Sequence, residues 1–318
     1  MRRRFLRPGL RVALAILAAL LVLSCAPPDR PAALGPPVPR EALALLHPDT
    51  VRSLTVASGV RYHYLWSPVG PWAVHLLEVD AGRCGVGFAV VRAPGAPGSS
   101  TARRAVPELL GYAPPGAVAA VNGDFFLPEG RPLGPELSSS GFRSRRERPV
   151  FSWMPGRGAW IGTAEVVGDS AVRVAGATGR PDRLPRGTAI VSGYPVLLDG
   201  GRRVGDLEVS ERPSFAALRH ARTLVGRAAG SQRLWLAVVD GRQGAYSEGM
   251  TLPEAAELLE SLGSTDALNL DGGGSSVMVL GDRTVSRPAG DEGERAVVNA
   301  LVVLSDPSGC PISAPDRG

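Results

Sequence analysis

The sequence contains no lysine: all 35 of its basic residues are arginine, against 30 acidic residues. A chain without lysine cannot form a Schiff base between a lysine and a carbonyl substrate or cofactor. It also cannot build the phosphate loop G-x-x-x-x-G-K-[ST], because that loop requires its lysine. Any phosphate that this protein holds must therefore rest on arginine forks, hydroxyl groups and backbone amides.

Cysteine and histidine are also scarce, with three and four residues in the chain of 318. No H-x-x-H pair and no cysteine cluster occurs, so the usual ligand patterns of a zinc site are missing. The sequence requires no cofactor. Ca²⁺ or Mg²⁺ remains possible, since such ions prefer carboxylate oxygens and three aspartates fall in the motifs described below, namely Asp124, Asp240 and Asp271.

The formal net charge of +5 arises at the N-terminus, where the first eleven residues contain five arginines and no acidic residue. An apolar run from Val12 to Leu23 follows, which is shorter than the ~20 residues of an ordinary transmembrane helix. A basic segment before such a run is typical of an export signal, so we expect residues 1–24 to be removed. The remaining 30 arginines and 30 acidic residues balance, which argues against a nucleic-acid partner.

The end of this run, Val22 to Cys25, resembles a lipobox, in which Cys25 would carry lipid and become the first mature residue. The alternative is a plain secretory signal. The expected location is the bacterial cell envelope, as an exported, membrane-anchored lipoprotein. Lipidation would leave Cys84 and Cys310 as an even pair, for which an oxidising compartment permits a disulfide; the alternative is two separate buried thiols.

The composition divides the rest of the chain into four parts. Residues 25–50 begin with the lipidated cysteine and continue as a proline-rich linker, because residues 26–40 contain six prolines. Residues 51–80 are predicted to form N-terminal strands or a small annex. Residues 80–305 form the main domain, and residues 306–318 form a C-terminal tail.

Strand signals dominate the main part of the chain. Apolar, β-branched runs bounded by Gly and Pro predict strands at residues 60–66, 72–79, 86–91, 117–121, 189–198, 234–239, 267–270 and 297–304. Thr251 and Glu254 form a capping-box signature that predicts a helix from residue 251 to 262, and a weaker helix is predicted at 101–110. The arginine-rich segment 128–149 is predicted to be a long functional loop. This pattern predicts an α+β fold with a mixed or antiparallel β-sheet core, few helices and a single large domain.

The most informative segment is A-L-N-L-D-G-G-G-S-S, residues 267–276. A predicted strand delivers Asp271 to three glycines and the hydroxyl groups of Ser275 and Ser276. Consecutive glycines let backbone N–H groups turn toward one point, which makes an anion-binding nest. A carboxylate at the mouth of that nest suits acid, base or nucleophilic chemistry, or a metal. The alternative is a tight turn between strands.

Polar side chains also follow two other predicted strands, and a third segment, from Arg222 to Gly226, carries an arginine on a strand. Arg242, two residues after Asp240, could clamp a phosphate; the alternative is a surface ion pair with Asp240 or Glu248. Asn122 and Asp124 follow the strand at 117–121, where the alternative is a turn whose aromatic neighbours fill the core. The pair Arg222 and Thr223 says little alone. Of the histidines, His220 is nearest to a motif, and none is assigned to the site.

Together these segments resemble the phosphodiester glycosidase domain family, which includes the catalytic domain of the mannose-6-phosphate uncovering enzyme and bacterial relatives. The resemblance covers roughly residues 80–305 and rests on N-G-D-F-F (122–126), R-T (222–223), D-G-R-Q (240–243), S-E-G-M-T (247–251) and N-L-D-G-G-G-S-S (269–276), followed by Arg295 and Asn299. Asp124 departs from the family, which often has a second glycine there. Ser286-Arg287-Pro288 departs as well, because an Asn is expected before x-Pro. Both departures bear on substrate selectivity.

The resemblance implies hydrolysis of the glycosidic bond of a sugar-1-phosphodiester, similar to an N-acetylglucosamine-1-phosphodiester, in envelope or extracellular glycans. The alternative is a non-catalytic phosphoglycan-binding surface lipoprotein on the same fold. The expected partners are a phosphorylated glycan and, through Cys25, a membrane. The implied catalytic residues are Asp271, as the first-choice carboxylate, Asp240 as the second, and Arg222, Arg242 and Ser275, which would hold the diester. The implied substrate-binding residues are Asn122, Asp124, Thr223, Ser247, Asn269, Gly272, Gly273, Gly274, Ser276 and Arg295.

Overall fold

The computed structural model describes residues 38–95, 102–138, 141–143, 146–167, 171–174, 184, 186–204, 207, 213–290 and 293–310. The predicted signal sequence and the lipidation site at Cys25 lie outside these residues. From Val38 onward the chain forms one compact unit. Within the described part, no helix combines the length and the apolar character that a membrane span requires.

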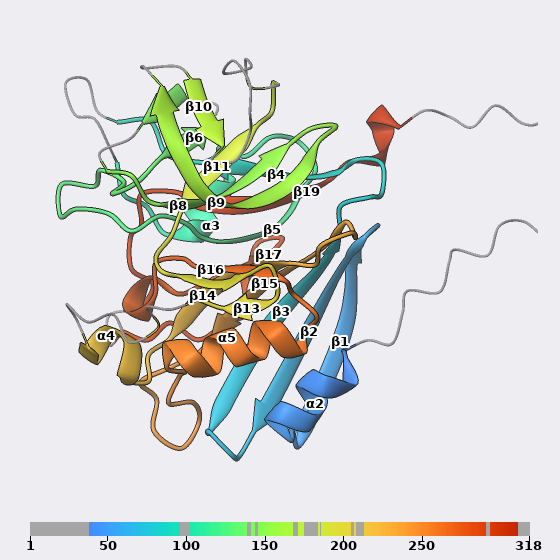
Figure 1. The fold of residues 1–318 in the computed structure, drawn as a ribbon, viewed down its shortest axis with the longest axis vertical. Coiled ribbons are helices and arrows are strands. Elements are labelled where there is room, and N and C mark those ends of the chain that lie inside the picture. Colours follow the sequence, from blue (N-terminus) through green and yellow to red (C-terminus); the bar gives the residue numbers. More distant parts are fainter. Residues whose placement is uncertain are drawn as a thin grey trace, which may run out of the picture. The chain divides into compact units, whose positions relative to one another are not determined.

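Three antiparallel sheets make up this unit (Figure 1). The eight-stranded sheet has the order β1 (Thr50–Ala57), β2 (Val60–Ser67), β3 (Trp72–Asp80), β15 (Arg233–Val239), β14 (Arg222–Arg227), β16 (Asp266–Asn269), β12 (Val196–Asp199) and β13 (Arg202–Arg203). The five-stranded sheet has the order β18 (Arg283–Thr284), β17 (Met278–Leu280), β5 (Ala117–Asn122), β19 (Ala300–Ser305) and β4 (Val86–Val91). The six-stranded sheet has the order β10 (Ala171–Val174), β9 (Gly158–Val167), β8 (Pro149–Met154), β11 (Ala189–Ser192), β6 (Glu136–Ser138) and β7 (Gly141–Arg143).

Helices are few and short in the described residues: α2 (Arg40–Leu46), α3 (Val106–Leu110), α4 (Pro213–Ala217) and α5 (Leu252–Ser261), with single 3₁₀ turns at Gly273–Ser275 and Pro307–Gly309. The capping box before α5 is present as predicted, since the Thr251 side chain accepts from the Glu254 amide and the Glu254 side chain accepts from the Thr251 amide. The architecture confirms the predicted α+β class.

The eight-stranded sheet separates two apolar cores. Along β15, Trp235, Ala237 and Val239 belong to the cluster that contains α5, whereas Leu234, Leu236 and Val238 belong to the cluster shared with the other sheets. This alternation follows from the two-residue repeat of a strand, which sends successive side chains to opposite faces. The sheet is therefore buried on both faces over its central strands, and the ends of those strands carry the polar motifs.

Three local predictions need correction. The run at 189–198 is not one strand: it is split between β11 and β12 in different sheets, with Gly193 and the cis Tyr194–Pro195 bond between them. The predicted loop at 128–149 contains the short pair β6 and β7. The predicted helix at 101–110 is reduced to α3, because the chain before it forms a β-bridge between Arg104 and Val297.

The N-terminal part is more ordered than the predicted linker of residues 25–50. Its last residues form α2 and the start of β1. Ala42 and Leu46, four residues apart, lie on the buried face of α2 and join the core beneath α5. Residues 51–80 supply β1, β2 and β3, and β3 pairs with β15, so these strands continue the main sheet.

Cys84 and Cys310 form a disulfide, which confirms the predicted pairing over the alternative of two free thiols. Cys84 lies in the turn after β3, and Cys310 follows the last 3₁₀ turn. The bond joins residues 226 positions apart in the sequence and so ties the end of the described chain to an early strand.

Candidate active site

The loop after β16 carries Asp271, and the neighbouring strand β5 holds it in place. The Asp271 amide donates to the Gly123 carbonyl (3.1 Å), and the Asn122 side-chain amide donates to the Asp271 carbonyl (2.6 Å). The Asn122 side-chain oxygen in turn accepts from the Thr223 hydroxyl (2.7 Å) and the Val277 amide (3.2 Å). Asn122 and Thr223 thus fix the backbone of the loop, and both are fully buried.

The glycines after Asp271 are only partly available to an anion. The Gly272 amide donates to the Asp271 carboxylate (3.0 Å), and the Gly273 amide donates to the Ala221 carbonyl (2.7 Å). Among the described hydrogen bonds this leaves the Gly274 amide for a ligand. The predicted nest of three convergent amides is therefore reduced to one, because the amides of Gly272 and Gly273 bond within the protein.

The glycines serve a second purpose, which is close approach by arginine. A Cβ atom at Gly273 would lie 3.1 Å from Nη2 of Arg242, and one at Gly274 would lie 3.2 Å from the guanidinium carbon of Arg295. Gly273 also has a φ of +60°, which favours glycine. Two exposed guanidinium groups from distant parts of the chain thus lie against the loop that begins with Asp271.

The electrostatic setting of Asp271 combines burial with positive charge. Burial raises the pKa of Asp271 to about 6, while the Ser275 hydroxyl, Arg295, the Gly272 amide and Arg148 oppose that shift in decreasing order. A carboxyl group with this pKa changes protonation near neutral pH, which suits a general acid or base. This raised pKa is what the predicted acid or base role of Asp271 requires.

Arg222 lies beneath the site with its guanidinium already engaged. Nε donates to the Met250 carbonyl (2.8 Å), and Nη2 donates to the carbonyls of Phe215 (2.8 Å) and Leu218 (3.2 Å). Burial, with Arg242 nearby, lowers the pKa of Arg222 to about 10. Arg222 is 1% exposed. Its hydrogen bonds join α4 to the segment before α5, and its guanidinium does not face solvent.

Asp240 occupies a different environment from Asp271. Its carboxylate pairs with Nε2 of His75 (3.1 Å) and accepts from the Tyr246 hydroxyl (3.1 Å) and the Arg287 amide (2.9 Å). It is 1% exposed. Ser247 supports the same turn, since its hydroxyl donates to the Asp240 carbonyl (2.7 Å) and accepts from the Ala73 amide (3.0 Å). The structure thus places both predicted site residues in a saturated polar network.

Asp124 and Asn269 are also committed within the fold. The Asp124 carboxylate accepts from the Ser192 amide (2.8 Å), the Ser192 hydroxyl and the Asn299 side-chain amide (2.6 Å). Burial, and secondarily the charge of Glu136, raises its pKa well above the usual range. The Asn269 side chain donates to the Tyr194 carbonyl (2.7 Å) and is fully buried. These contacts fix the turn between β11 and β12.

Ser275 and Ser276 remain close to the site. Both are buried, and neither hydroxyl oxygen has a hydrogen bond of good geometry among the described residues. The Ser275 hydroxyl is nevertheless near enough to Asp271 to lower its pKa. Ser275 is thus a candidate donor to the same ligand that meets Asp271.

Arg148, which is close enough to Asp271 to lower its pKa, had no role in the sequence prediction, and neither had Tyr194 and Phe215. The Arg148 guanidinium stacks over the rings of Phe125 (5.3 Å) and Tyr194 (5.5 Å), and the rings of Phe125 and Phe215 lie 6.1 Å apart. The only sequence signal for Arg148 is its place in the arginine-rich segment 128–149. These half-buried aromatic side chains give the site an apolar rim.

His220 contacts the site through Arg242. Its Nδ1 lies 3.3 Å from Nη2 of Arg242, and its Nε2 lies 3.3 Å from the Ser214 carbonyl. Burial and the two neighbouring arginines, Arg222 and Arg242, lower the pKa of His220, which favours the neutral imidazole. A neutral His220 can accept a hydrogen bond and so steady the Arg242 guanidinium.

Within the described residues, no group of three or more His, Cys, Asp or Glu side chains is arranged to hold a metal ion. The three aspartates considered for Ca²⁺ or Mg²⁺ have separate partners. Asp124 meets Ser192 and Asn299, Asp240 meets His75, and Asp271 lies in the glycine loop.

Comparison with known sequences points to one family. The profile of the phosphodiester glycosidase family matches residues 115–304, more than half of the chain. This range contains Asp271, Arg242, Arg295 and Arg148. A separate comparison with curated proteins gives no significant match.

Solved structures share the fold at low sequence identity. A hypothetical protein from Synechocystis is 19% identical with a TM-score of 0.61, over 81% of this chain and 64% of that protein. A Burkholderia pseudomallei protein, described as a candidate exported protein, is 20% identical with a TM-score of 0.56, over 74% of each chain. The catalytic domain of zebrafish N-acetylglucosamine-1-phosphodiester alpha-N-acetylglucosaminidase, auto-inhibited by its pro-peptide, is 22% identical with a TM-score of 0.57, over 81% of this chain and 82% of that domain.

Proposed function

This chain belongs to the phosphodiester glycosidase family, and we propose on that basis that it hydrolyses the glycosidic bond of a sugar-1-phosphodiester. The name of the zebrafish domain makes an N-acetylglucosamine-1-phosphodiester the first substrate to test. The physiological substrate would be a phosphorylated glycan of the cell envelope or its surroundings.

One observation carries this proposal: a carboxyl group with a pKa of about 6 lies in a loop that two guanidinium groups face. Arg242 and Arg295 can hold the diester oxygens through paired hydrogen bonds. The Gly274 amide and the Ser275 hydroxyl add neutral donors. Because the charge of the leaving phosphate grows as the bond breaks, fixed donors of this kind stabilise the transition state.

The reaction breaks the bond between C1 of the sugar and the bridging phosphate oxygen. The electron pair stays on that oxygen, which leaves as a phosphomonoester held by Arg242 and Arg295. A water oxygen forms the new bond to C1, and its proton passes to Asp271 in its ionised form, directly or after Asp271 has stabilised the oxocarbenium-like centre. A phosphomonoester is a good leaving group, so the reaction needs little help from a separate acid.

The cellular setting forms part of the proposal. A basic, apolar N-terminal segment ending in Cys25 supports export and lipid anchoring, and the Burkholderia protein of similar fold is described as a candidate exported protein. A phosphodiester glycosidase anchored in this way would meet envelope glycans. Radiolabelled palmitate incorporated by wild-type protein and not by Cys25→Ala would support the anchor, and equal labelling would contradict it.

The activity is tested with purified protein and a panel of sugar-1-phosphodiesters, with the products identified by NMR. We expect a free sugar and a phosphomonoester from at least one substrate, with loss of turnover in Asp271→Asn at an unchanged fold. Saturable binding of the same compounds without any product would favour the non-catalytic alternative. Full turnover in the double variant Asp271→Asn/Arg242→Ala would contradict the site assignment.

A further inference from the structure

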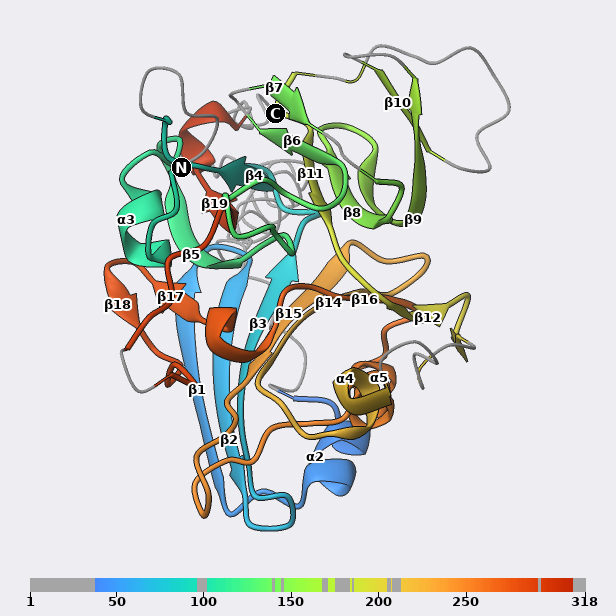
Figure 2. The same ribbon diagram turned by 90° about the vertical axis from the view of Figure 1, so that its left-hand side faces the viewer.

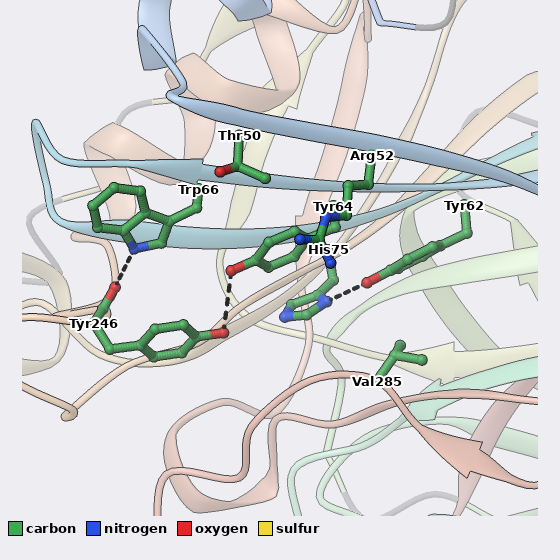
Figure 3. Close-up of a pocket in the computed structure, with 8 residues that line it drawn as sticks. All are labelled: Thr50, Arg52, Tyr62, Tyr64, Trp66, His75, Tyr246 and Val285. Atoms are coloured by element: carbon green, nitrogen blue, oxygen red, sulfur yellow. Dashed lines mark hydrogen bonds between the residues drawn. The ribbon is translucent and has the colours of Figure 1, made fainter.

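A cavity lies on the eight-stranded sheet, and no residue of the Asp271 loop is among those that line it (Figure 3). Its volume is about 700 Å³. The side chains around it are mostly aromatic, and they come from β1, β2, β3, the loop after β15 and the segment after β18. The lining residues are Thr50, Arg52, Tyr62, Tyr64, Trp66, His75, Tyr246 and Val285.

The aromatic side chains form a row along one face of β2. Leu65 points into the core beneath α5, so Tyr62, Tyr64 and Trp66 point to the opposite face. Their cross-strand partners on β1 are Leu54, Arg52 and Thr50, respectively. Figure 2 shows β1, β2 and β3 running beyond the five-stranded sheet. The side chains of this row are half-buried, and Tyr64 and Trp66 contact Tyr246 in the loop after β15.

A network of hydrogen bonds fixes the rings. The Tyr62 hydroxyl bonds to Nδ1 of His75 (2.7 Å), whose Nε2 pairs with the buried Asp240 carboxylate (3.1 Å). Tyr246 is held at two points, because its hydroxyl donates to Asp240 (3.1 Å) and its carbonyl accepts from Nε1 of Trp66 (2.9 Å). The aromatic faces are therefore oriented before any ligand arrives, which lowers the entropy cost of binding.

The Tyr64 hydroxyl is the loosest member of this network, since it lies 3.5 Å from the Tyr246 hydroxyl. It can therefore turn to a ligand. The cavity thus offers fixed apolar ring faces with hydroxyl and guanidinium groups at their edges. A sugar ring has the matching surface, with an apolar C–H face and a rim of hydroxyl groups. Pockets that orient small molecules combine aromatic walls with a few polar groups in this way.

We propose that this cavity is a second carbohydrate-binding site, which holds a sugar ring of a glycan chain outside the Asp271 centre. The choice of a glycan rests on the proposed function. The chain also links the two places: Arg242, against the Asp271 loop, and Tyr246, in the cavity, are four residues apart. Four residues span at most about 14 Å between their Cα atoms, a distance that a short oligosaccharide can cover.

The charges around the cavity favour a neutral or anionic sugar. Arg52 lines the cavity, and the Arg287 guanidinium stacks 4.3 Å from the centre of the Tyr246 ring. Both would repel a quaternary ammonium ion, the other ligand class that aromatic cages bind. The Asp240 carboxylate does not offset them at the surface, because it is buried and bonded to His75, Tyr246 and the Arg287 amide.

The test measures binding of oligosaccharides that carry no phosphodiester: chitotetraose, cellotetraose and a hyaluronan tetrasaccharide. Saturation-transfer NMR and calorimetry on wild-type protein report binding at millimolar concentration. Tyr64→Ala should weaken the affinity for the bound sugar at least about fivefold, whereas Tyr64→Phe, which keeps the ring, should stay within about twofold. Thermal melting of both variants shows whether they fold, and Trp66→Ala gives a second ring deletion.

Binding of at least one sugar, weakened by Tyr64→Ala and Trp66→Ala and kept by Tyr64→Phe, supports the site. The proposal is wrong if no sugar in the panel binds, if the alanine variants bind like wild type, or if tetramethylammonium or a peptide of residues 26–37 binds here in place of sugar. Sugar binding without any hydrolysis of sugar-1-phosphodiesters would refute the proposed function and leave this site standing. Hydrolysis of a sugar-1-phosphodiester, together with unaltered sugar binding in Tyr64→Ala, would support the proposed function and refute this second site.

Discussion

Asp240 and Asp271 stand in similar sequence contexts but in opposite surroundings. Each follows an apolar strand and precedes glycine, and their strands, β15 and β16, flank β14 at the same end of the sheet. Asp240 is 1% exposed and accepts from a histidine, a tyrosine and a backbone amide. Asp271 is partly exposed, accepts from the amide of the next residue and has arginine side chains nearby.

The contrast teaches that an aspartate at a strand end can accept a hydrogen bond from a ligand only where the fold leaves it acceptor capacity. A carboxylate that already has several donors serves to hold the segments that supply them. Asp240 connects β3, the loop of Tyr246 and the segment of Arg287 in this way. Asp271 retains capacity for a ligand, and the arginines beside it favour an anionic one.

Two conservative substitutions test the contrast between Asp240 and Asp271 most directly. Asp271→Asn should lower kcat/KM for a sugar-1-phosphodiester by about 10²–10⁴-fold, the usual contribution of a general acid or base. Asp240→Asn should mainly lower the free energy of unfolding, by about 1–3 kcal/mol, because it leaves donors without a charged acceptor. Kinetics and denaturant unfolding on both variants measure the two effects. The reverse pattern would show that the roles of the two aspartates have been exchanged.

Two arginines sharpen the same distinction. Arg242→Ala should reduce kcat/KM roughly a hundredfold with little change in melting temperature, because its guanidinium is exposed at the glycine loop. Arg222→Ala should reduce the free energy of unfolding by about 2–4 kcal/mol, since it leaves buried carbonyl groups unpaired. If Arg222→Ala melted like wild type and lost only turnover, Arg222 would belong to the catalytic site after all.

The pH dependence of stability offers a third test. Burial raises the pKa of Asp271 in the folded state to about 6, above the value of about 3.9 in an unfolded chain. The folded protein therefore binds this proton more tightly, and the contribution to stability is full below about pH 4 and is lost as the pH rises through about 6. Asp271→Asn should raise the free energy of unfolding near pH 7.5 by about 1–3 kcal/mol and change it little near pH 4. A lower stability of this variant near pH 7.5 would contradict the sign.

The smallest expected effect concerns the network around Asp240. Tyr246→Phe removes one donor to Asp240 and should lower the free energy of unfolding by about 1 kcal/mol. Hydrolysis of a small sugar-1-phosphodiester provides the second readout. A drop in kcat with an altered pH profile would show that Asp240 takes part in the chemistry, and would remove the distinction between the two aspartates.

The sequence was sufficient for the features that depend on local pattern. The strand before Asp271 and the capping box of α5 follow from local pattern alone, and the motifs around Asp271 and Arg242 identified the family. The disulfide was one of two alternatives that the sequence left open for Cys84 and Cys310, and the structure decides between them. The saturation of Asp240 could not be predicted, because His75 lies 165 positions earlier and meets it only across β3 and β15. The position of Arg148 beside the site could not be predicted for the same reason, because its contacts with Phe125 and Tyr194 depend on how separate sheets pack.

The sequence predicted one of the two roles of the glycines after Asp271. Flexibility at Gly272, Gly273 and Gly274 suggested a nest of amides, but the structure uses two of those amides internally. What the sequence could not show is that the missing side chains make room for Arg242 and Arg295. Such contacts depend on the tertiary approach of segments that are distant in the sequence.

The central claim is that the chain cleaves the glycosidic bond, and isotope labelling of the product tests it most directly. Hydrolysis of an N-acetylglucosamine-1-phosphodiester in ¹⁸O-water, followed by mass spectrometry of both products, shows which bond has broken. We predict that the label enters the free sugar at C1 and that the phosphomonoester carries none. Label in the phosphomonoester would show cleavage of the phosphorus–oxygen bond and would contradict the proposed function.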